Sequence, residues 1–111
     1  MELSIDFQRG SDPRSARVIL TGDLDGDGGR AARRSLEGLL DAGRVDLTVN
    51  LDRVGFLDSS GLASLIASLR RARELGGDVR VQTTNGRIRR ILEVTALSQV
   101  FKLQPAASAA A

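Results

Sequence analysis

The sequence contains no cysteine and no histidine. Without thiols the chain can form neither disulfide bonds nor a cysteine nucleophile, and without imidazoles it also lacks the usual general base and most zinc sites. The absence of cysteine agrees with a reducing compartment, and we expect a cytoplasmic protein. The two absences together point away from an enzyme.

Aromatic residues and long apolar runs are also scarce. The only aromatics are Phe7, Phe56 and Phe101, so the core of this 111-residue chain has to come from Leu, Ile, Val and Ala. No apolar run approaches the about 20 residues that span a bilayer, and residues 1–10 lack the pattern of a signal peptide, so we expect no membrane partner. The net charge of only +2 predicts no direct contact with nucleic acid. Two groups of arginines are accordingly interpreted as solvated helix faces: Arg70, Arg71 and Arg73, and Arg87, Arg89 and Arg90.

Along its whole length the chain contains apolar residues that recur with the period of a strand or of a helix. Because strands and helices alternate, we expect an α/β fold in the order β-β-α-β-α-β-α, with helices packed on a mixed, mostly parallel sheet of four to five strands. The predicted strands are residues 3–8, 16–20, 46–52 and 78–82. The predicted helices are residues 30–42, ended by Gly43, residues 60–75, with Ser64, Ser68 and Arg71 on a polar face, and a third helix after Gly86 with Ile88, Ile91 and Leu92. The residues expected to cover or extend the sheet are Leu97, Val100, Phe101 and Leu103.

Two segments between these elements are predicted to be connections. Residues 52–57 form an apolar link, and residues 21–29 form an acidic, glycine-rich loop. The twelfth position of a calcium loop needs a glutamate but is Arg34 here, and a strand precedes the loop, so we expect no metal and no cofactor. The carboxylates should instead favour the start of the next helix. The residues that match the first half of a calcium loop are Asp23, Asp25, Asp27 and Gly28.

A carboxylate and two hydroxyls, Asp58, Ser59 and Ser60, lie where an apolar stretch passes into a helix. Asp and Ser are preferred N-caps, so capping is the simplest interpretation. A serine hydrolase would need a base, and with no histidine only the single lysine, Lys102, remains, so we expect no catalytic residue. The third interpretation is a hydroxyl that another protein modifies. A phosphate there would meet unpaired N–H groups and the positive end of the helix dipole, against repulsion from Asp58.

Three stretches of the sequence resemble the STAS domain family, and within it the bacterial anti-sigma factor antagonists. They are residues 20–25, residues 91–101 and, most specific, residues 56–62 with the sequence Phe-Leu-Asp-Ser-Ser-Gly-Leu. The resemblance extends over about residues 3–103 in the family's order and implies a single STAS domain over residues 1–104. We expect residues 105–111, a proline followed by Ala and Ser, to form a flexible C-terminal tail.

The resemblance implies a protein-binding module that phosphorylation switches. An antagonist of this family binds an anti-sigma factor that is also a serine kinase, and so releases a sigma factor. The kinase phosphorylates the first serine after the aspartate, which is Ser59 here, and the modified form no longer binds until a serine phosphatase restores it. The residues that the resemblance assigns to partner binding are Asp23, Asp25, Asp58, Ser59, Ser60, Gly61 and Leu62.

An alternative within the same family is a structural STAS subunit of a transporter or of a stress-signalling scaffold, in which Ser59 would only help to cap a helix. The sequence also departs from the family in two ways. Gly26, Gly28 and Gly29 predict a loose and mobile start of the first helix. The short segment after residue 104 predicts a reduced final layer.

Overall fold

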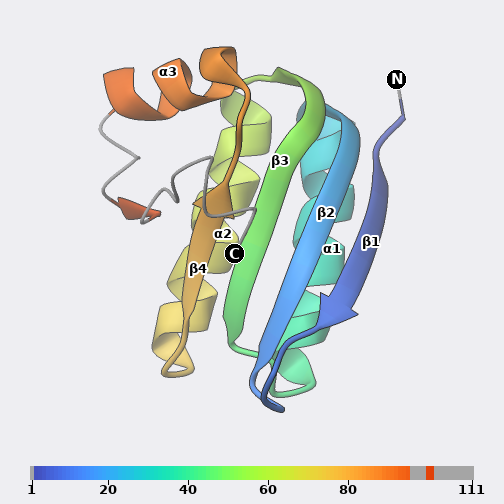
Figure 1. Cartoon of the computed structure of the whole chain (residues 1–111), viewed down its shortest axis with the longest axis vertical. Helices are drawn as coiled ribbons and strands as arrows, with labels where there is room; N and C mark the ends of the chain where they lie inside the picture. The colour runs from blue at the N-terminus through green and yellow to red at the C-terminus, as the bar shows by residue number, and fades with distance from the viewer. Residues whose placement is uncertain (1, 96–99, 102–111) are drawn as a thin grey trace.

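The computed structural model describes residues 2–95 and 100–101. Its elements are β1 (Ser4–Arg9), β2 (Ser15–Leu24), α1 (Gly26–Asp41), β3 (Asp46–Leu57), α2 (Ser59–Glu74), β4 (Asp78–Gln82) and α3 (Gly86–Val94). The strands form one four-stranded sheet in the order β1-β2-β3-β4 (Figure 1). β1 runs antiparallel to β2, and the other neighbours are parallel. This arrangement confirms the predicted fold class and order of elements.

The core lies between the sheet and the helices α1 and α2, which Figure 1 shows side by side behind the sheet. Every second residue of β2 from Ala16 to Leu24 is buried, because the two-residue period of a strand turns alternate side chains to one face. In α1 the buried residues include Ala32, Leu36 and Leu40, which recur every four residues and so share one helix face.

The strands β2 and β3 are longer than the sequence predicted. Residues 21–24, expected in a loop, continue β2, and residues 52–57, expected to be a link, continue β3. The two segments pair with each other, and Leu24 lies opposite Leu57 at the end of the ladder. Two register shifts interrupt the regular pairing of these segments, and Gly22 adopts a positive φ of +118° there. Pairing between distant segments therefore overrides the local turn signals.

The helices also begin earlier than predicted. α1 starts at Gly26, so residues 26–29 of the expected loop form its first turn. α2 starts at Ser59 and α3 at Gly86. The predicted stop after the first helix is confirmed, because Gly43 has the positive φ of +92° that suits a helix C-terminus.

The last described residues cover the outer edge of β4. Phe101 is fully buried, and its carbonyl accepts a hydrogen bond from Val81 N–H at 3.3 Å. The Arg73 guanidinium donates to the Val100 carbonyl at 2.8 Å. Phe101 thus covers the sheet as expected, and the described residues contain no fifth strand. The remaining C-terminal predictions, for Leu97, Leu103 and the tail of residues 105–111, lie outside the described residues.

The face of the sheet away from α1 and α2 carries a network of polar side chains. Arg17 of β2 and Asn50 of β3 both donate to Gln82 Oε1 of β4, at 2.8 and 3.2 Å. Asp52 accepts hydrogen bonds from Asn50 Nδ2 and from both the hydroxyl and the backbone N–H of Thr84. Because Thr84 lies just before α3, Asp52 attaches the start of that helix to β3.

This network lowers the pKa of Asp52. Burial alone would raise the pKa, but hydrogen bonds from Thr84 and Asn50 and the positive charge of Arg17 outweigh burial and bring the pKa below its ordinary value of 3.8. The folded protein therefore favours the ionised carboxylate.

We expect Asp52→Asn to remove a pH-dependent part of the folding free energy. Because the folded-state pKa lies below the unfolded value of 3.8, ionised Asp52 stabilises the fold above about pH 4, and this contribution is lost as the pH falls through the folded-state pKa. Urea unfolding at neutral and at acid pH measures the effect, and the gap between wild type and variant should shrink in acid. Glu93→Gln, on the exposed surface of α3, is the control. A gap that stays constant with pH would contradict the role of Asp52.

Candidate functional site

Two strand-to-helix junctions lie side by side at the carboxyl end of the parallel strands. β2 passes into α1 at Asp25, and β3 passes into α2 at Asp58. The residues just before them, Leu24 and Leu57, lie opposite each other in the ladder. The Asp58 N–H also donates to the Leu24 carbonyl at 3.3 Å. Residues from two separate stretches of the sequence therefore meet at the edge of the sheet where α/β proteins commonly bind their ligands.

Both aspartates cap their helices in the same way. Asp25 Oδ1 accepts a hydrogen bond from Gly28 N–H at 2.8 Å. Asp58 Oδ1 accepts the equivalent bond from Gly61 N–H at 2.9 Å. Each cap satisfies one N–H donor that the start of a helix leaves unpaired, which confirms the capping interpretation. The spacing Leu-Asp-x-x-Gly occurs at both junctions, and this repeated pattern is a signal in the sequence that could have predicted their equivalence.

Glycines allow the two helix starts to approach the sheet and each other. A Cβ on Gly61 would lie 1.9 Å from the Leu24 carbonyl oxygen. A Cβ on Gly28 would lie 2.0 Å from the Asp23 carbonyl oxygen, and one on Gly29 would lie 3.0 Å from Gly61 Cα. The expectation of a loose helix start is therefore wrong for Gly28 and Gly29, which are buried in tight contacts.

Ser59 presents an accessible hydroxyl at this edge. It is the first residue of α2, it is exposed, and its hydroxyl makes no hydrogen bond with any described residue. Ser60 is exposed as well, whereas Gly61 is buried and Leu62 is half-buried against the core. The structure thus gives Gly61 and Leu62 a packing role beneath the two serines.

Asp23 lies on the β3 side of the site. It is opposite Phe56 in the ladder, and its Oδ1 is 3.9 Å from the position that a Cβ on Gly55 would take. Phe56 is 51% exposed, although it belongs to an apolar stretch of the sequence. Aromatic residues such as Phe are enriched in surfaces that contact another protein.

A hollow of about 220 Å³ continues this surface between β3 and α3. Phe56 and Leu57 line it from β3, and Arg87 and Ile91 line it from α3. Phe56 and Arg87 were not predicted as site residues. The position of Phe56 two residues before the Asp58 cap could have indicated the first, but no local signal indicates Arg87, because its place depends on how α3 is attached.

Two carboxylates, Asp25 and Asp58, lie in the junctions at the edge that carries Ser59. A hollow of about 550 Å³ beside the start of α1 is lined by Glu2 and Asp27, and Asp27 also pairs with Arg30. The positive ends of the α1 and α2 dipoles meet these carboxylates, which stabilises both helix starts. A phosphate on Ser59 would therefore find favourable N–H groups within α2 but would add negative charge directly after Asp58.

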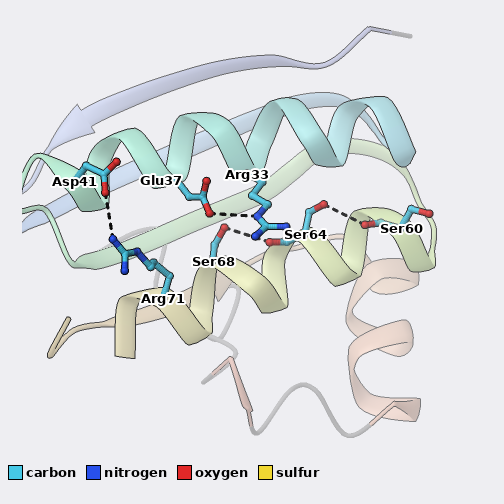
Figure 2. A network of polar contacts seen from close by, with 7 residues as sticks. All are labelled: Arg33, Glu37, Asp41, Ser60, Ser64, Ser68 and Arg71. Carbon is cyan, nitrogen blue, oxygen red and sulfur yellow. Dashed lines mark hydrogen bonds and ion pairs between the residues drawn. The ribbon is translucent and has the colours of Figure 1, made fainter. Parts of the chain in front are cut away.

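α1 packs beside α2 (Figure 2), and at the Ser59 end of α2 a Cβ on Gly29 of α1 would lie 3.0 Å from Gly61 Cα. Within α2, Ser64 Oγ donates to the Ser60 carbonyl, and Ser68 Oγ donates to the Ser64 carbonyl, both at 3.2 Å. Ser68 is fully buried, so the predicted polar face of this helix is in part an interior face. Toward the other end of α2, Arg71 pairs with Asp41 of α1 at 3.5 Å.

Ser59 directly follows a carboxylate in the sequence. The neighbouring carboxylate, Asp58, is hydrogen-bonded to the backbone of its own helix. Within residues 2–95 and 100–101, no three His, Cys, Asp or Glu side chains are grouped so that they could hold a metal ion. No helix in the described part of the chain has the length and apolar character that crossing a membrane requires.

Comparison with models of known protein families tests the resemblance to the STAS domain family. The family model described as "Mlab, STAS domain" matches residues 7–105. The chain belongs to the STAS domain family. The matched residues include both strand-to-helix junctions, and the resemblance noted from the sequence is confirmed.

Several relatives of this STAS domain are anti-sigma factor antagonists. The anti-sigma-B factor antagonist of Bacillus subtilis (strain 168) is 22% identical over 103 residues, which cover 93% of this chain and 92% of that protein. The crystal structure of an anti-sigma factor antagonist from Mycobacterium paratuberculosis has a TM-score of 0.76 and 24% identity, over 92% of this chain and 86% of that one. The Bacillus cell fate determinant SpoIIAA in its phosphorylated form has a TM-score of 0.71 and 16% identity, over 96% of both chains. At these identities the solved structures establish the fold.

We expect Gly61→Ala to destabilise the STAS domain by about 1–3 kcal/mol, because the added methyl group would overlap the Leu24 carbonyl oxygen. Urea unfolding measures the loss. Gly86→Ala is the matched control, since a Cβ there meets no atom within 4 Å. If both variants unfolded at the wild-type midpoint, the two helix starts could not be as tightly packed as described.

Proposed function

We propose that this STAS domain is an anti-sigma factor antagonist. It is a binding module without catalytic activity that captures an anti-sigma factor serine kinase in the cytoplasm and so releases a sigma factor. The observation that carries the proposal is the exposed Ser59 hydroxyl, which lies at the first residue of α2 beside a second capped helix start. A kinase can reach this hydroxyl without unfolding either helix.

Phosphorylation of Ser59 switches the surface through its charge. A phosphate adds about −1.5 to −2 charges at neutral pH, directly after Asp58. The N–H groups and the dipole of α2 accommodate the phosphate, so the helix persists and the added charge acts on the docked partner. The unmodified form binds the kinase, the phosphorylated form does not, and a serine phosphatase restores binding.

The proposed docking surface joins carboxylates, hydroxyls and one aromatic ring. The carboxylates of Asp23 and Asp25 favour basic side chains on the partner, which sets the orientation of docking. Phe56, half exposed, supplies an apolar anchor of the kind that carries much of the binding energy of an interface. The residues of α2 and its cap that complete or support this surface are Asp58, Ser59, Ser60, Gly61 and Leu62.

The names of the relatives support this proposal. The matched proteins from Bacillus subtilis and Mycobacterium paratuberculosis are called antagonists of anti-sigma factors. SpoIIAA, which shares the fold, has been solved in a phosphorylated form. The choice of Ser59 as the acceptor here rests on its position directly after the Asp58 cap and on its exposure.

A structural subunit of a transporter or of a stress-signalling scaffold is the second candidate. Asp58 caps α2, and Gly61 packs against Leu24, whether or not Ser59 is modified, so the junction is also useful without a switch. A pull-down that recovers a transporter ATPase and no kinase would favour this candidate.

Substitutions at Ser59 test the switch by binding. Ser59→Ala should bind the cognate anti-sigma kinase as unmodified wild type does, and should keep binding when ATP is present. Ser59→Asp should bind at least about tenfold more weakly, because docking would bury a charged carboxylate where the unmodified protein has a neutral hydroxyl. Isothermal titration calorimetry with anti-sigma kinases from the same genome measures both affinities, and Ser11→Ala, on the exposed turn between β1 and β2, is the control. Wild-type affinity of Ser59→Asp would refute the switch.

Mass spectrometry of the intact protein tests the acceptor itself. Incubation with ATP and a kinase that binds the chain should add one phosphate to wild type and to Ser60→Ala, and none to Ser59→Ala. The serine phosphatase should remove that phosphate. A kinase that binds tightly but leaves Ser59 unmodified would argue for the structural role instead.

A further inference from the structure

β1 leaves one edge of the sheet open. It is the outermost strand and, among the described strands, pairs only with β2 (Figure 1). Five of its six residues are exposed, and Phe7 is 58% exposed. An open edge presents backbone N–H and C=O groups with which another strand can pair. This edge therefore offers a partner both a hydrogen-bonding backbone and an aromatic ring.

An uncharged groove of about 290 Å³ lies between β1 and α1. Ile5 and Phe7 line it from β1, and Ser35, Gly38 and Leu39 line it from α1. A Cβ built on Gly38 would meet no atom within 4 Å, so the groove is open above this glycine. An apolar side chain from a partner would have room in it.

The sequence of β1 is self-complementary when two copies pair in antiparallel orientation. If Ile5 of one copy lies opposite Ile5 of the other, Leu3 lies opposite Phe7, and the apolar side chains of both copies form one stripe on the helix side. On the other side Ser4 lies opposite Asp6, so a hydroxyl can donate to a carboxylate. A shift of two residues would instead place Asp6 opposite Asp6, and the like charges would repel each other.

α1 permits the same arrangement. Antiparallel pairing around a two-fold axis makes one continuous sheet and leaves both α1 helices on the same face of it. Ser35 and Gly38, on the groove side of α1, are small and uncharged, whereas Arg33 and Glu37 lie on the side that faces α2 (Figure 2). The groove side of each helix is therefore uncharged where the two copies approach, and Phe7 of each copy lies beside Leu3 of the other.

We propose that the partner of β1 is a second copy of this chain, and that the protein forms a two-fold dimer through its β1 edges. Pairing satisfies the open backbone groups of both strands and places Leu3 of each copy beside Phe7 and the groove of the other. Because the paired strands run in opposite directions, the two Ser59 edges point to opposite ends of the dimer and stay accessible. The dimer does not depend on the function proposed for Ser59.

Sedimentation equilibrium tests the dimer. With rising concentration the wild-type mass should approach twice the chain mass of 11.8 kDa. Phe7→Glu should weaken association at least about tenfold, because it removes the apolar contact and places carboxylates in the groove. Phe56→Glu changes the other half-exposed phenylalanine and should associate like wild type. Thermal unfolding checks that both variants fold. A wild type that stays monomeric, or equal weakening by both substitutions, would overturn the proposal.

Single cysteines test the register, because the natural chain has no cysteine that could compete. In the proposed register the two Ile5→Cys residues are directly opposite, with Cα atoms about 4.5–5.5 Å apart, which suits a disulfide. The two Asp6→Cys residues would be offset by two positions and about 8 Å apart, beyond reach. Under mild oxidation Ile5→Cys should form a disulfide-linked dimer and Asp6→Cys should not. The reverse result, or equal linkage of both, would overturn the proposal.

Discussion

The backbone of α2 touches the backbone of β2 at Gly61, and the geometry of the candidate site depends on this contact. An added Cβ would lie 1.9 Å from the Leu24 carbonyl oxygen, so only glycine brings the helix start so close. The same carbonyl accepts a hydrogen bond from Asp58 N–H. One backbone oxygen of β2 thus positions both the end of β3 and the start of α2. Asp25 and Ser59 share one edge of the sheet as a result, although 33 residues separate them in the sequence.

Most of the fold could be predicted because each element buries one face, and that face is visible in the sequence as a period. The alternation of Leu47 and Val49, for example, predicts β3 correctly over its first half. Its second half could not be predicted, since residues 52–57 are strand only because they pair with β2. The interior position of Ser68 has a similar cause, because α1 covers a side of α2 that composition alone marks as polar.

Some features of the candidate site are likewise determined by neighbouring residues in the sequence, and others by contacts between distant residues. The caps and the exposed serine follow from a short motif, because capping involves residues only three apart. The hollow lined by Phe56 and Arg87 does not, because it exists only where α3 meets the end of β3. That meeting depends on the bonds between Asp52 and Thr84, which are 32 residues apart. Residues whose position depends on contacts with a distant part of the chain leave no local signal in the sequence.

The course of the chain before β1 has a practical consequence. Glu2 and Leu3 line the hollow beside Asp25 and Asp27, and the Glu2 carbonyl comes so close to Gly22 that a Cβ there would lie 2.5 Å from it. A fluorescent label attached at Glu2 would therefore lie next to the carboxylates of this hollow. Affinities measured with that label would report on the label together with the protein, whereas labels attached to exposed residues at the opposite end of the sheet, such as Asp12, would avoid this interference.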